Sequence, residues 1–134
     1  ACGVMQLMPI TARKFGLNDS TMMIPENNIA ASIGYIKRLQ KIFACIPDST
    51  EQTKFILASY NSGPAHILDA RRLAEKYGTD NNKWDSVEHY LLLLNEEEYY
   101  TDSVVKYGSF NANVTVKYVH AVLNTCTRIK NRDF

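Results

Sequence analysis

Residues 55–66, with the sequence FILASYNSGPAH, end one helical pattern and start another. An apolar helix is predicted to run into Tyr60 and Asn61 and to stop at Ser62–Gly63, because glycine adopts backbone angles that other residues avoid. Pro64 then suits the first turn of a new helix. Such a break would place a phenol and a carboxamide at the end of a rigid element, where they can line a groove. A purely structural helix–turn–helix could carry the same residues, so both interpretations stay open.

Helical periodicity continues on both sides of this break. Ile29, Ile33 and Ile36 recur at helical spacing and predict the buried face of one helix. Ser49 and Gln52 have the spacing of a capping box, which predicts a helix start at Ser49. No alternating strand pattern of useful length is present, so the predicted fold class is all-α. Helices are predicted over residues 9–15, 27–43, 49–60, 65–76, 84–94 and 113–130.

The composition fits one ordinary globular domain. The 134 residues, 46% apolar and 22% charged, are enough for a single sizeable core, and one domain over residues 1–134 is expected. A formal net charge of +1 gives no basic field, so a nucleic-acid partner is not expected. No stretch approaches the roughly 18 apolar residues of a membrane span. The chain opens on Ala1 without an initiator methionine, and we interpret it as part of a longer protein.

The cysteines and histidines predict no metal site. Three cysteines are odd in number and widely spaced, at Cys2, Cys45 and Cys126. They match neither a metal-binding pair nor a dense disulfide framework, and buried or partly buried free thiols are the favoured interpretation. A disulfide between Cys45 and Cys126 stays open for an oxidising compartment. The histidines lack the mutual spacing of metal ligands, so no metal or other cofactor is expected.

Two motifs resemble those of one enzyme family. Residues 3–9, GVMQLMP, resemble the GLMQ-type segment of lytic transglycosylases with a lysozyme-like fold, with Val4 where leucine is usual. Residues 58–64, ASYNSGP, resemble the AYNAGP segment of the same family, with serine at two positions where alanine is common. Trp84, a tyrosine pair and Tyr118 follow in the expected order. The resemblance therefore covers nearly the whole chain.

The resemblance implies a goose-type or soluble-lytic-transglycosylase-like helical domain whose N-terminal helix is missing. Such enzymes cleave the MurNAc-β-1,4-GlcNAc bond of peptidoglycan without water and leave 1,6-anhydroMurNAc ends. One glutamate acts first as acid and then as base, which requires a raised pKa in a sheltered groove. In the family this glutamate precedes the GLMQ segment, and no residue here matches it. Glu26 and Glu51 lie at predicted helix starts and are interpreted as structural, so the catalytic set is empty and the isolated chain is predicted to be inactive.

The resemblance also implies a set of substrate-binding residues. Met5 and Gln6 would line the sugar groove, Tyr60 would orient the family's glutamate, and Asn61 would lie beside the substrate. Tyr118 would close the groove floor. Each has a structural alternative: core packing for Met5, Tyr60 and Tyr118, a buried backbone partner for Gln6, and a helix cap for Asn61. Trp84 is interpreted as a core residue rather than a sugar platform.

Two functions are therefore expected to compete. The first is a partial lytic transglycosylase catalytic domain, and the second is a lysozyme-like domain that only binds glycan or scaffolds other wall proteins. His66 and residues 68–71 favour the membrane-bound branch of the family. That branch implies peptidoglycan strands as partner, an upstream solute-binding-like domain, and a bacterial cell envelope location, periplasmic or attached to the outer membrane. A monomer is expected.

Overall fold

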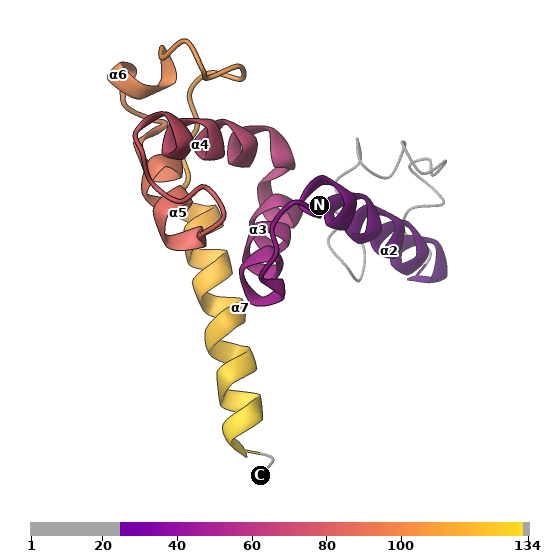
Figure 1. Ribbon diagram of the computed structural model, residues 1–134. Helices are drawn as coiled ribbons and strands as arrows, with labels where there is room; N and C mark the ends of the chain where they lie inside the picture. Colours follow the sequence, from indigo (N-terminus) through magenta and orange to yellow (C-terminus); the bar gives the residue numbers. More distant parts are fainter. Residues whose placement is uncertain (1–24, 133–134) are drawn as a thin grey trace. The chain divides into compact units, whose positions relative to one another are not determined.

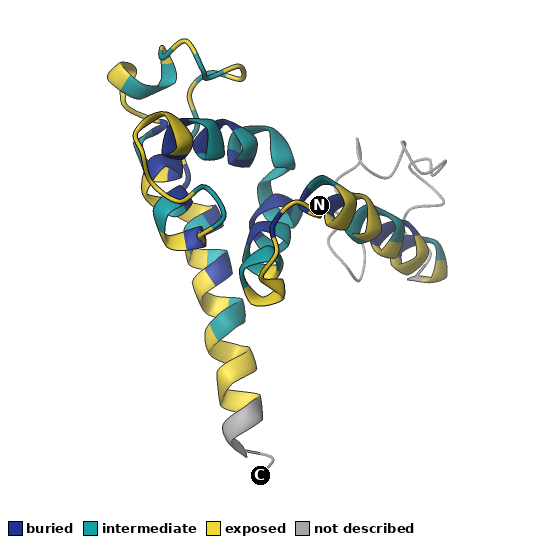
Figure 2. Cartoon of the chain, viewed as in Figure 1, coloured by how far each residue is buried: buried dark blue, intermediate teal, exposed yellow. Residues whose placement is uncertain are grey.

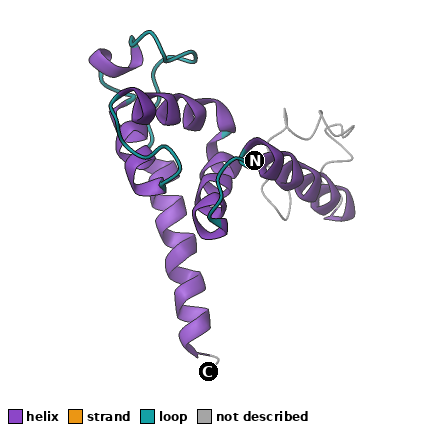
Figure 3. Cartoon of the chain, in the orientation of Figure 1, coloured by secondary structure: helices purple, strands orange, loops and turns teal. Residues whose placement is uncertain are grey.

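The computed structural model describes residues 25–132, and every regular element in this range is a helix (Figures 1 and 3). This confirms the all-α prediction, whereas the helix predicted over residues 9–15 lies outside the described part. The chain divides into two compact units, residues 1–42 and 43–134, and each is considered by itself. The helices are α2 (Pro25–Ile42), α3 (Ser49–Ser62), α4 (Pro64–Lys76), α5 (Trp84–Leu93), α6 (Glu97–Tyr100) and α7 (Asn113–Arg132).

Helix α2 is the described part of the first unit. It begins at Pro25, two residues earlier than predicted, since proline fits the first helical position. Ala31 and Leu39 are buried, but Ile29 and Ile33 are 40% and 46% exposed. The predicted buried face was therefore wrong for these two isoleucines. Apolar residues occur on more than one side of α2, and periodicity alone does not decide which side is covered.

The core of the second unit forms where α3, α4 and α5 pack together. The Phe55 ring lies 5.6 Å from Phe43 and 5.3 Å from Trp84, whose ring it meets edge to face. Aromatic pairs of this kind add about 0.5–1.5 kcal/mol beyond area burial. Trp84 is 2% exposed, which confirms it as a core residue. The largest fully buried side chains of this unit include Phe43, Phe55, Ile67, Leu73, Trp84 and Leu91.

Helix α3 starts at Ser49 as predicted, but its cap differs from the prediction. Asp48, in extended conformation, is the N-cap, and its carboxylate accepts the Glu51 N–H at 3.0 Å. This hydrogen bond lowers the pKa of Asp48. Gln52 does not close a capping box with Ser49, because its amide nitrogen donates to the Phe43 carbonyl at 2.9 Å. Aspartate caps helices as well as serine does, and here it lies one residue earlier.

Glu51 links the starts of two helices. One carboxylate oxygen accepts the backbone N–H of Trp84, the first residue of α5, at 3.0 Å. The other oxygen lies 3.5 Å from the Lys54 ammonium. The first amides of a helix have no partner within it, so this carboxylate satisfies one of them from outside. The structural role predicted for Glu51 agrees with these contacts.

Helix α7 is buried only along its first half. Val119 is fully buried, whereas Ile129 is 54% exposed and Cys126 is exposed. Figure 2 shows the exposed residues along the second half of α7. The first half of α7 thus packs against other helices of the second unit, α3 among them. Among residues 25–132, no helix is both long and apolar enough to cross a membrane.

The cysteines of the described residues are unbridged. Cys45 and Cys126 are both exposed free thiols, so the disulfide left open between them does not form, and the predicted burial of these thiols was wrong. The Cys45 sulfur lies 3.6 Å from a guanidinium nitrogen of Arg71. Cys2 lies outside the described residues.

Candidate functional site

The break between α3 and α4 lies where the sequence predicts it. Gly63 has φ 84° and ψ 159°, a conformation that is essentially restricted to glycine, and Pro64 opens α4. The Gly63 N–H donates to the Ser59 carbonyl at 2.7 Å, which ends α3 with a hydrogen bond. A Cβ added at Gly63 would meet open space, so backbone conformation rather than crowding requires the glycine here.

Asn61, in the last turn of α3, contacts the start of α7. The Thr115 hydroxyl donates to the Asn61 side-chain oxygen at 2.8 Å. Thr115 is 2% exposed, and Asn61 is partly buried. A buried hydroxyl needs a partner, and this contact supplies one across 54 residues of sequence. The carboxamide is therefore fixed by a neighbouring helix instead of capping its own.

Tyr60 and Tyr118 come from the same two helices. Both are partly buried. Burial raises the pKa of the Tyr118 hydroxyl, and the nearby Tyr60 raises it further. Helices α3 and α7 contact one another, and the two phenols interact electrostatically. Tyr118 is therefore protonated at neutral pH, and its hydroxyl can donate a hydrogen bond to a ligand.

His66, in the first turn of α4, stacks on the segment that leads into α7. Its ring lies 4.4 Å from the Phe110 ring at an interplanar angle of 12°. Its Nδ1 atom is buried and makes no hydrogen bond within the described residues. Burial lowers the pKa of His66, and the opposing effect of the Asp69 carboxylate is smaller. The imidazole is therefore held in its neutral form, since an uncharged ring is cheaper to bury.

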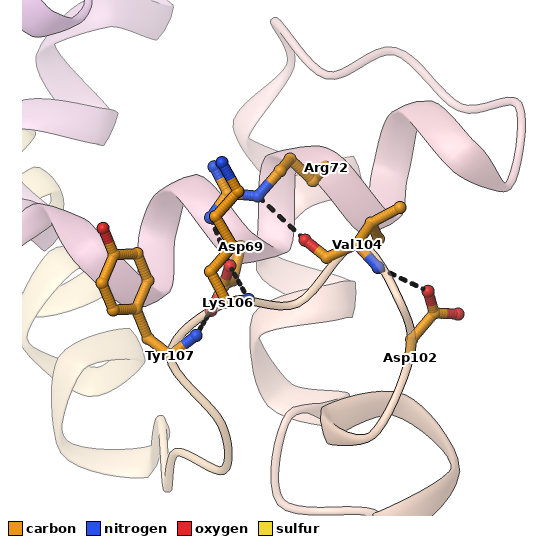
Figure 4. A network of polar contacts seen from close by, with 6 residues as sticks. All are labelled: Asp69, Arg72, Asp102, Val104, Lys106 and Tyr107. Carbon is orange, nitrogen blue, oxygen red and sulfur yellow. Dashed lines mark hydrogen bonds and ion pairs between the residues drawn. The ribbon is translucent and has the colours of Figure 1, made fainter.

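A buried carboxylate of α4 anchors the loop between α6 and α7 (Figure 4). Asp69 is fully buried and accepts the backbone N–H groups of Lys106 and Tyr107, each at 2.8 Å. The Arg72 guanidinium pairs with the same carboxylate and donates to the Val104 carbonyl at 3.0 Å. Three hydrogen bonds thus join one turn of α4 to residues 104–107, and the Asp69–Arg72 pair links the two side chains that make them. We call this set, Asp69 and Arg72 with residues 104–107, the loop clamp.

Asp102 holds the same loop from its other end. Its carboxylate accepts the Lys76 ammonium at 2.7 Å, the Tyr77 hydroxyl at 3.3 Å and the Val104 N–H at 3.0 Å. The hydrogen bond from Lys76 is the largest cause of the lowered pKa of Asp102. These contacts fix the path of the chain that enters α7, the helix that bears Thr115 and Tyr118.

A comparison with known families finds a match over the first part of this chain. The Transglycosylase SLT domain family matches residues 1–83, a range that includes the break at Gly63 and the Tyr60–Asn61 pair. The chain belongs to this family. The lysozyme-like, all-α class predicted from the motifs is thereby confirmed.

Curated relatives of this SLT domain extend the match to α7. The chain is 36% identical to membrane-bound lytic murein transglycosylase F of Desulfosudis oleivorans over 97% of its length, which covers 28% of that protein. The protein of the same name from Maricaulis maris is 37% identical over 87% of the chain and 25% of its own length. That of Vibrio campbellii is 36% identical over 90% of the chain and 22% of its own length. The SLT domain thus spans about a quarter of these relatives.

Three of the predicted site residues fall within the described part. At the end of α3, the Asn61 side chain accepts a hydrogen bond from Thr115 of α7. Tyr60 interacts electrostatically with Tyr118 of the same helix. Met5 and Gln6 lie outside the described residues. No group of three or more His, Cys, Asp or Glu residues in the described part of the SLT domain could hold a metal ion.

The sequence analysis did not foresee the structural roles of two residues near the site, Thr115 and Asp69. Thr115 was missed because its partner is 54 residues away, and no local pattern links them. Asp69 left a detectable signal, since it lies beside Ile67, Ala70 and Leu73 on a helix face that is otherwise apolar. A lone carboxylate in such a position must be compensated by donors when it is buried.

Proposed function

We propose that this SLT domain takes part in lytic transglycosylation of peptidoglycan, the non-hydrolytic cleavage of the MurNAc-β-1,4-GlcNAc bond that leaves 1,6-anhydroMurNAc ends. The names of the relatives support the reaction type, although the chain covers only about a quarter of their length. The observation that carries the proposal is the convergence of the family motif at the end of α3 with the start of α7. Tyr60 and Asn61 there share one small region with Tyr118 and Thr115.

The reaction requires one carboxyl group that transfers protons, and residues that bind the glycan. The acid protonates the glycosidic oxygen, the muramoyl 6-hydroxyl then attacks the anomeric carbon, and the resulting carboxylate takes the proton of that hydroxyl. We assign no residue of this chain as the acid. Tyr60, Asn61 and Tyr118, with Met5 and Gln6, are proposed to bind and orient the glycan.

The neutral hydroxyl of Tyr118 suits this role. It can donate to sugar oxygens without presenting a charge, because a phenol whose pKa is raised above its usual value stays protonated at neutral pH. Asn61 adds a carboxamide whose position is fixed by Thr115. Neutral donors held by packed helices match a neutral sugar with many hydroxyl and carbonyl acceptors.

The proposed location is the bacterial cell envelope. Several relatives are named as membrane-bound murein transglycosylases, which places those proteins at the substrate. We propose that the protein containing this domain acts there, in the periplasm or attached to the outer membrane, as a monomer. The relatives are also longer than this chain, which is compatible with the proposed solute-binding-like domain upstream of it.

The test of the proposed reaction uses the full gene product and purified sacculi. We expect release of muropeptides with 1,6-anhydro ends, detected by liquid chromatography and mass spectrometry. Tyr60→Phe should lower kcat/KM roughly tenfold, equivalent to about 1.4 kcal/mol of transition-state stabilisation. Tyr107→Phe is the matched control, because Tyr107 is 56% exposed and its contact with Asp69 uses only the backbone. Binding to sacculi without any product would instead establish a glycan-binding or scaffolding domain.

The isolated 134-residue chain gives a separate answer about the acid. We expect it to bind sacculi in a pull-down but to release no anhydromuropeptides. Release by this short chain would show that one of its own carboxyl groups performs the proton transfer, and would overturn the empty catalytic assignment.

A further inference from the structure

The segment of residues 102–110, which leads into α7, is held along its length by side chains of α4. Its anchors follow one another in the order Lys76–Asp102, Arg72–Val104, Asp69 with Lys106 and Tyr107, and His66–Phe110. Figure 4 shows the two middle anchors. The first three anchors use a charged side chain of α4. The fourth is a stack of two aromatic rings, and it is the anchor nearest to α7 in the sequence.

The His66–Phe110 stack secures the residues that precede α7. The ring centroids lie 4.4 Å apart at an interplanar angle of 12°. The backbone N–H of Phe110 donates to the Leu94 carbonyl at the end of α5, at 3.1 Å. Ala112, the last residue before α7, is 3% exposed. The imidazole therefore packs on the chain just before the helix that carries part of the candidate site.

The surroundings of the His66 ring suit the neutral imidazole better than the charged one. A neutral imidazole carries a proton on one nitrogen, whereas an imidazolium ion carries one on each. The Nδ1 atom is buried and has no hydrogen-bond partner among the described residues. A charged ring would place a donor there without an acceptor, in addition to the cost of burying its charge. Moving the ring into water removes both costs.

The neighbouring charges do not reverse this preference. Asp69 favours the protonated ring, but burial has the larger effect on the pKa of His66. The Asp69 carboxylate is already paired with the Arg72 guanidinium and with two backbone N–H groups. Other titratable groups of the neighbouring elements do not shift this pKa, namely Tyr60, Lys106, Tyr107, Lys117 and Tyr118.

We propose that His66 is a positioning residue whose neutral imidazole holds the start of α7, so that binding by the proposed glycan-binding residues of α3 and α7 weakens as the pH falls. This inference rests on the proposed function of the SLT domain and concerns the regulation of its site. Below about pH 6.5, protonation favours the ring in water over the ring on Phe110. The segment before α7 then loses its last anchor, while the loop clamp stays in place.

The first experiment measures local opening by hydrogen exchange in the ¹⁵N-labelled 134-residue chain. It covers about pH 8 to about pH 5, the range in which histidine titrates. The protection factor of the Phe110 amide should fall with pH by at most about tenfold per pH unit, the limit for one proton. The Lys106 and Tyr107 amides, held by Asp69, should change less. In His66→Phe, the protection of Phe110 should not depend on pH.

Two results of this experiment would overturn the inference. An equal fall at the Phe110, Lys106 and Tyr107 amides would mean that the whole unit opens rather than the stack. A fall at Phe110 that persists in His66→Phe would assign the pH dependence to another group.

A second measurement follows the His66 ring and keeps the test valid if His66→Phe does not fold. A ¹H–¹³C NMR titration of the wild type should give His66 a pKa below about 6.5. Phe110→Leu removes the ring that covers the imidazole, so the pKa of His66 should return toward that value. A lower pKa in Phe110→Leu than in the wild type would show that the stack favours the charged ring, as in a cation–π contact, and would contradict the inference.

The third experiment connects the stack to the site. Chitotetraose, which has no group that titrates in this range, is titrated into the wild type and two variants at about pH 8 and about pH 5. We expect its Kd to rise several-fold at the lower pH in the wild type. His89→Gln, which removes an exposed imidazole, is the matched control and should behave in the same way. In His66→Phe the Kd should be the same at both pH values.

The binding results separate the inference from the proposed function. A wild-type Kd that does not change with pH overturns the inference and leaves glycan binding standing. The same rise in His66→Phe as in the wild type also overturns it, because His66 would then play only a structural part. Failure of the wild type to bind chitotetraose at either pH counts against the proposed function itself, and the inference falls with it.

Discussion

At the scale of single residues, the buried carboxylate of Asp69 holds the loop between α6 and α7. Burying a charge is unfavourable unless donors surround it. Two backbone amides and the Arg72 guanidinium supply those donors, and the backbone that provides the amides becomes fixed in return. The donors that compensate for burying the Asp69 charge thus also hold the loop in one conformation.

Replacing this carboxylate should destabilise the chain. We expect Asp69→Asn to lower the free energy of unfolding by about 2–3 kcal/mol. An amide has only one accepting oxygen, and its NH₂ group would face a backbone N–H that needs an acceptor. Urea unfolding followed by circular dichroism measures the change. Glu75→Gln, an exposed acidic residue of the same helix, should stay within about 0.5 kcal/mol of the wild type. Equal effects of the two substitutions would contradict the loop clamp.

His66 should make stability depend on pH in a defined direction. Its pKa in the folded chain is lowered from an ordinary value near 6.5, so between these two values the unfolded chain binds more protons than the folded chain. The free energy of unfolding should therefore fall as pH decreases below about 6.5, and level off once the folded chain is also protonated. Urea unfolding at several pH values measures this slope.

His66→Phe should reduce that slope while retaining an aromatic ring against Phe110. His89→Gln, which removes an exposed imidazole, is the matched control and should leave the slope as it is. A slope that survives in His66→Phe would assign the pH dependence to other groups.

At the scale of elements, the α3–α4 break is decided by backbone conformation. Gly63 occupies angles that residues with a Cβ rarely adopt, while the space around it is open. The following proline has no N–H and opens α4 at a position where an N–H would have no partner within the helix. Together they fix the direction in which α3 delivers Tyr60 and Asn61.

Gly63→Ala should therefore destabilise the chain through strain alone. We expect a loss of about 1–3 kcal/mol in the free energy of unfolding, the usual cost of such angles for a residue with a Cβ. Thermal or urea unfolding gives the value, and Glu75→Gln, a substitution at an exposed position of α4, serves as the control. An unaltered unfolding midpoint in Gly63→Ala would mean that the α3–α4 junction relaxes to ordinary angles.

Helix positions were predictable because their end signals are local. Gly63–Pro64 marks the α3–α4 boundary in the sequence, and α4 ends at Lys76 as predicted. Caps and faces were less predictable, since Asp48 and Ser49 are both good capping residues and only the folded chain shows which one accepts the hydrogen bond. The prediction of which face of α2 is buried failed for a related reason, because several sides of this helix carry apolar residues.

At the scale of the whole molecule, the two compact units differ in tryptophan content. Trp84 is the sole tryptophan of the chain and belongs to the second unit. It is 2% exposed and contacts Phe55, a residue of the same unit. Tryptophan fluorescence therefore reports on residues 43–134 alone.

The second unit is expected to fold without the first. A fragment of residues 43–134 should show helical circular dichroism, blue-shifted Trp84 emission and one cooperative unfolding transition, because α3, α4 and α5 supply its aromatic and aliphatic core. Red-shifted emission from a soluble fragment would show that residues 1–42 are needed for this core. Phe55→Ala within the fragment should cost about 3–5 kcal/mol and shift the emission to the red.

The candidate site was predictable only where it follows a family motif. Tyr60, Asn61 and Tyr118 were found through the resemblance, and the structure brings Asn61 and Tyr60 to the helix that bears Tyr118. Thr115 depends on a contact between distant segments, which composition and periodicity do not encode. Asp69 depends on how a loop some 37 residues later folds back onto α4.

The loop clamp also constrains how this gene can change in length. An amino acid inserted between Val104 and Tyr107 would move the Lys106 and Tyr107 amides out of register with the Asp69 carboxylate. Selection should therefore remove insertions and deletions at these positions. Ser109 is exposed and lies beyond the clamped residues, so codons gained or lost there should persist among descendants.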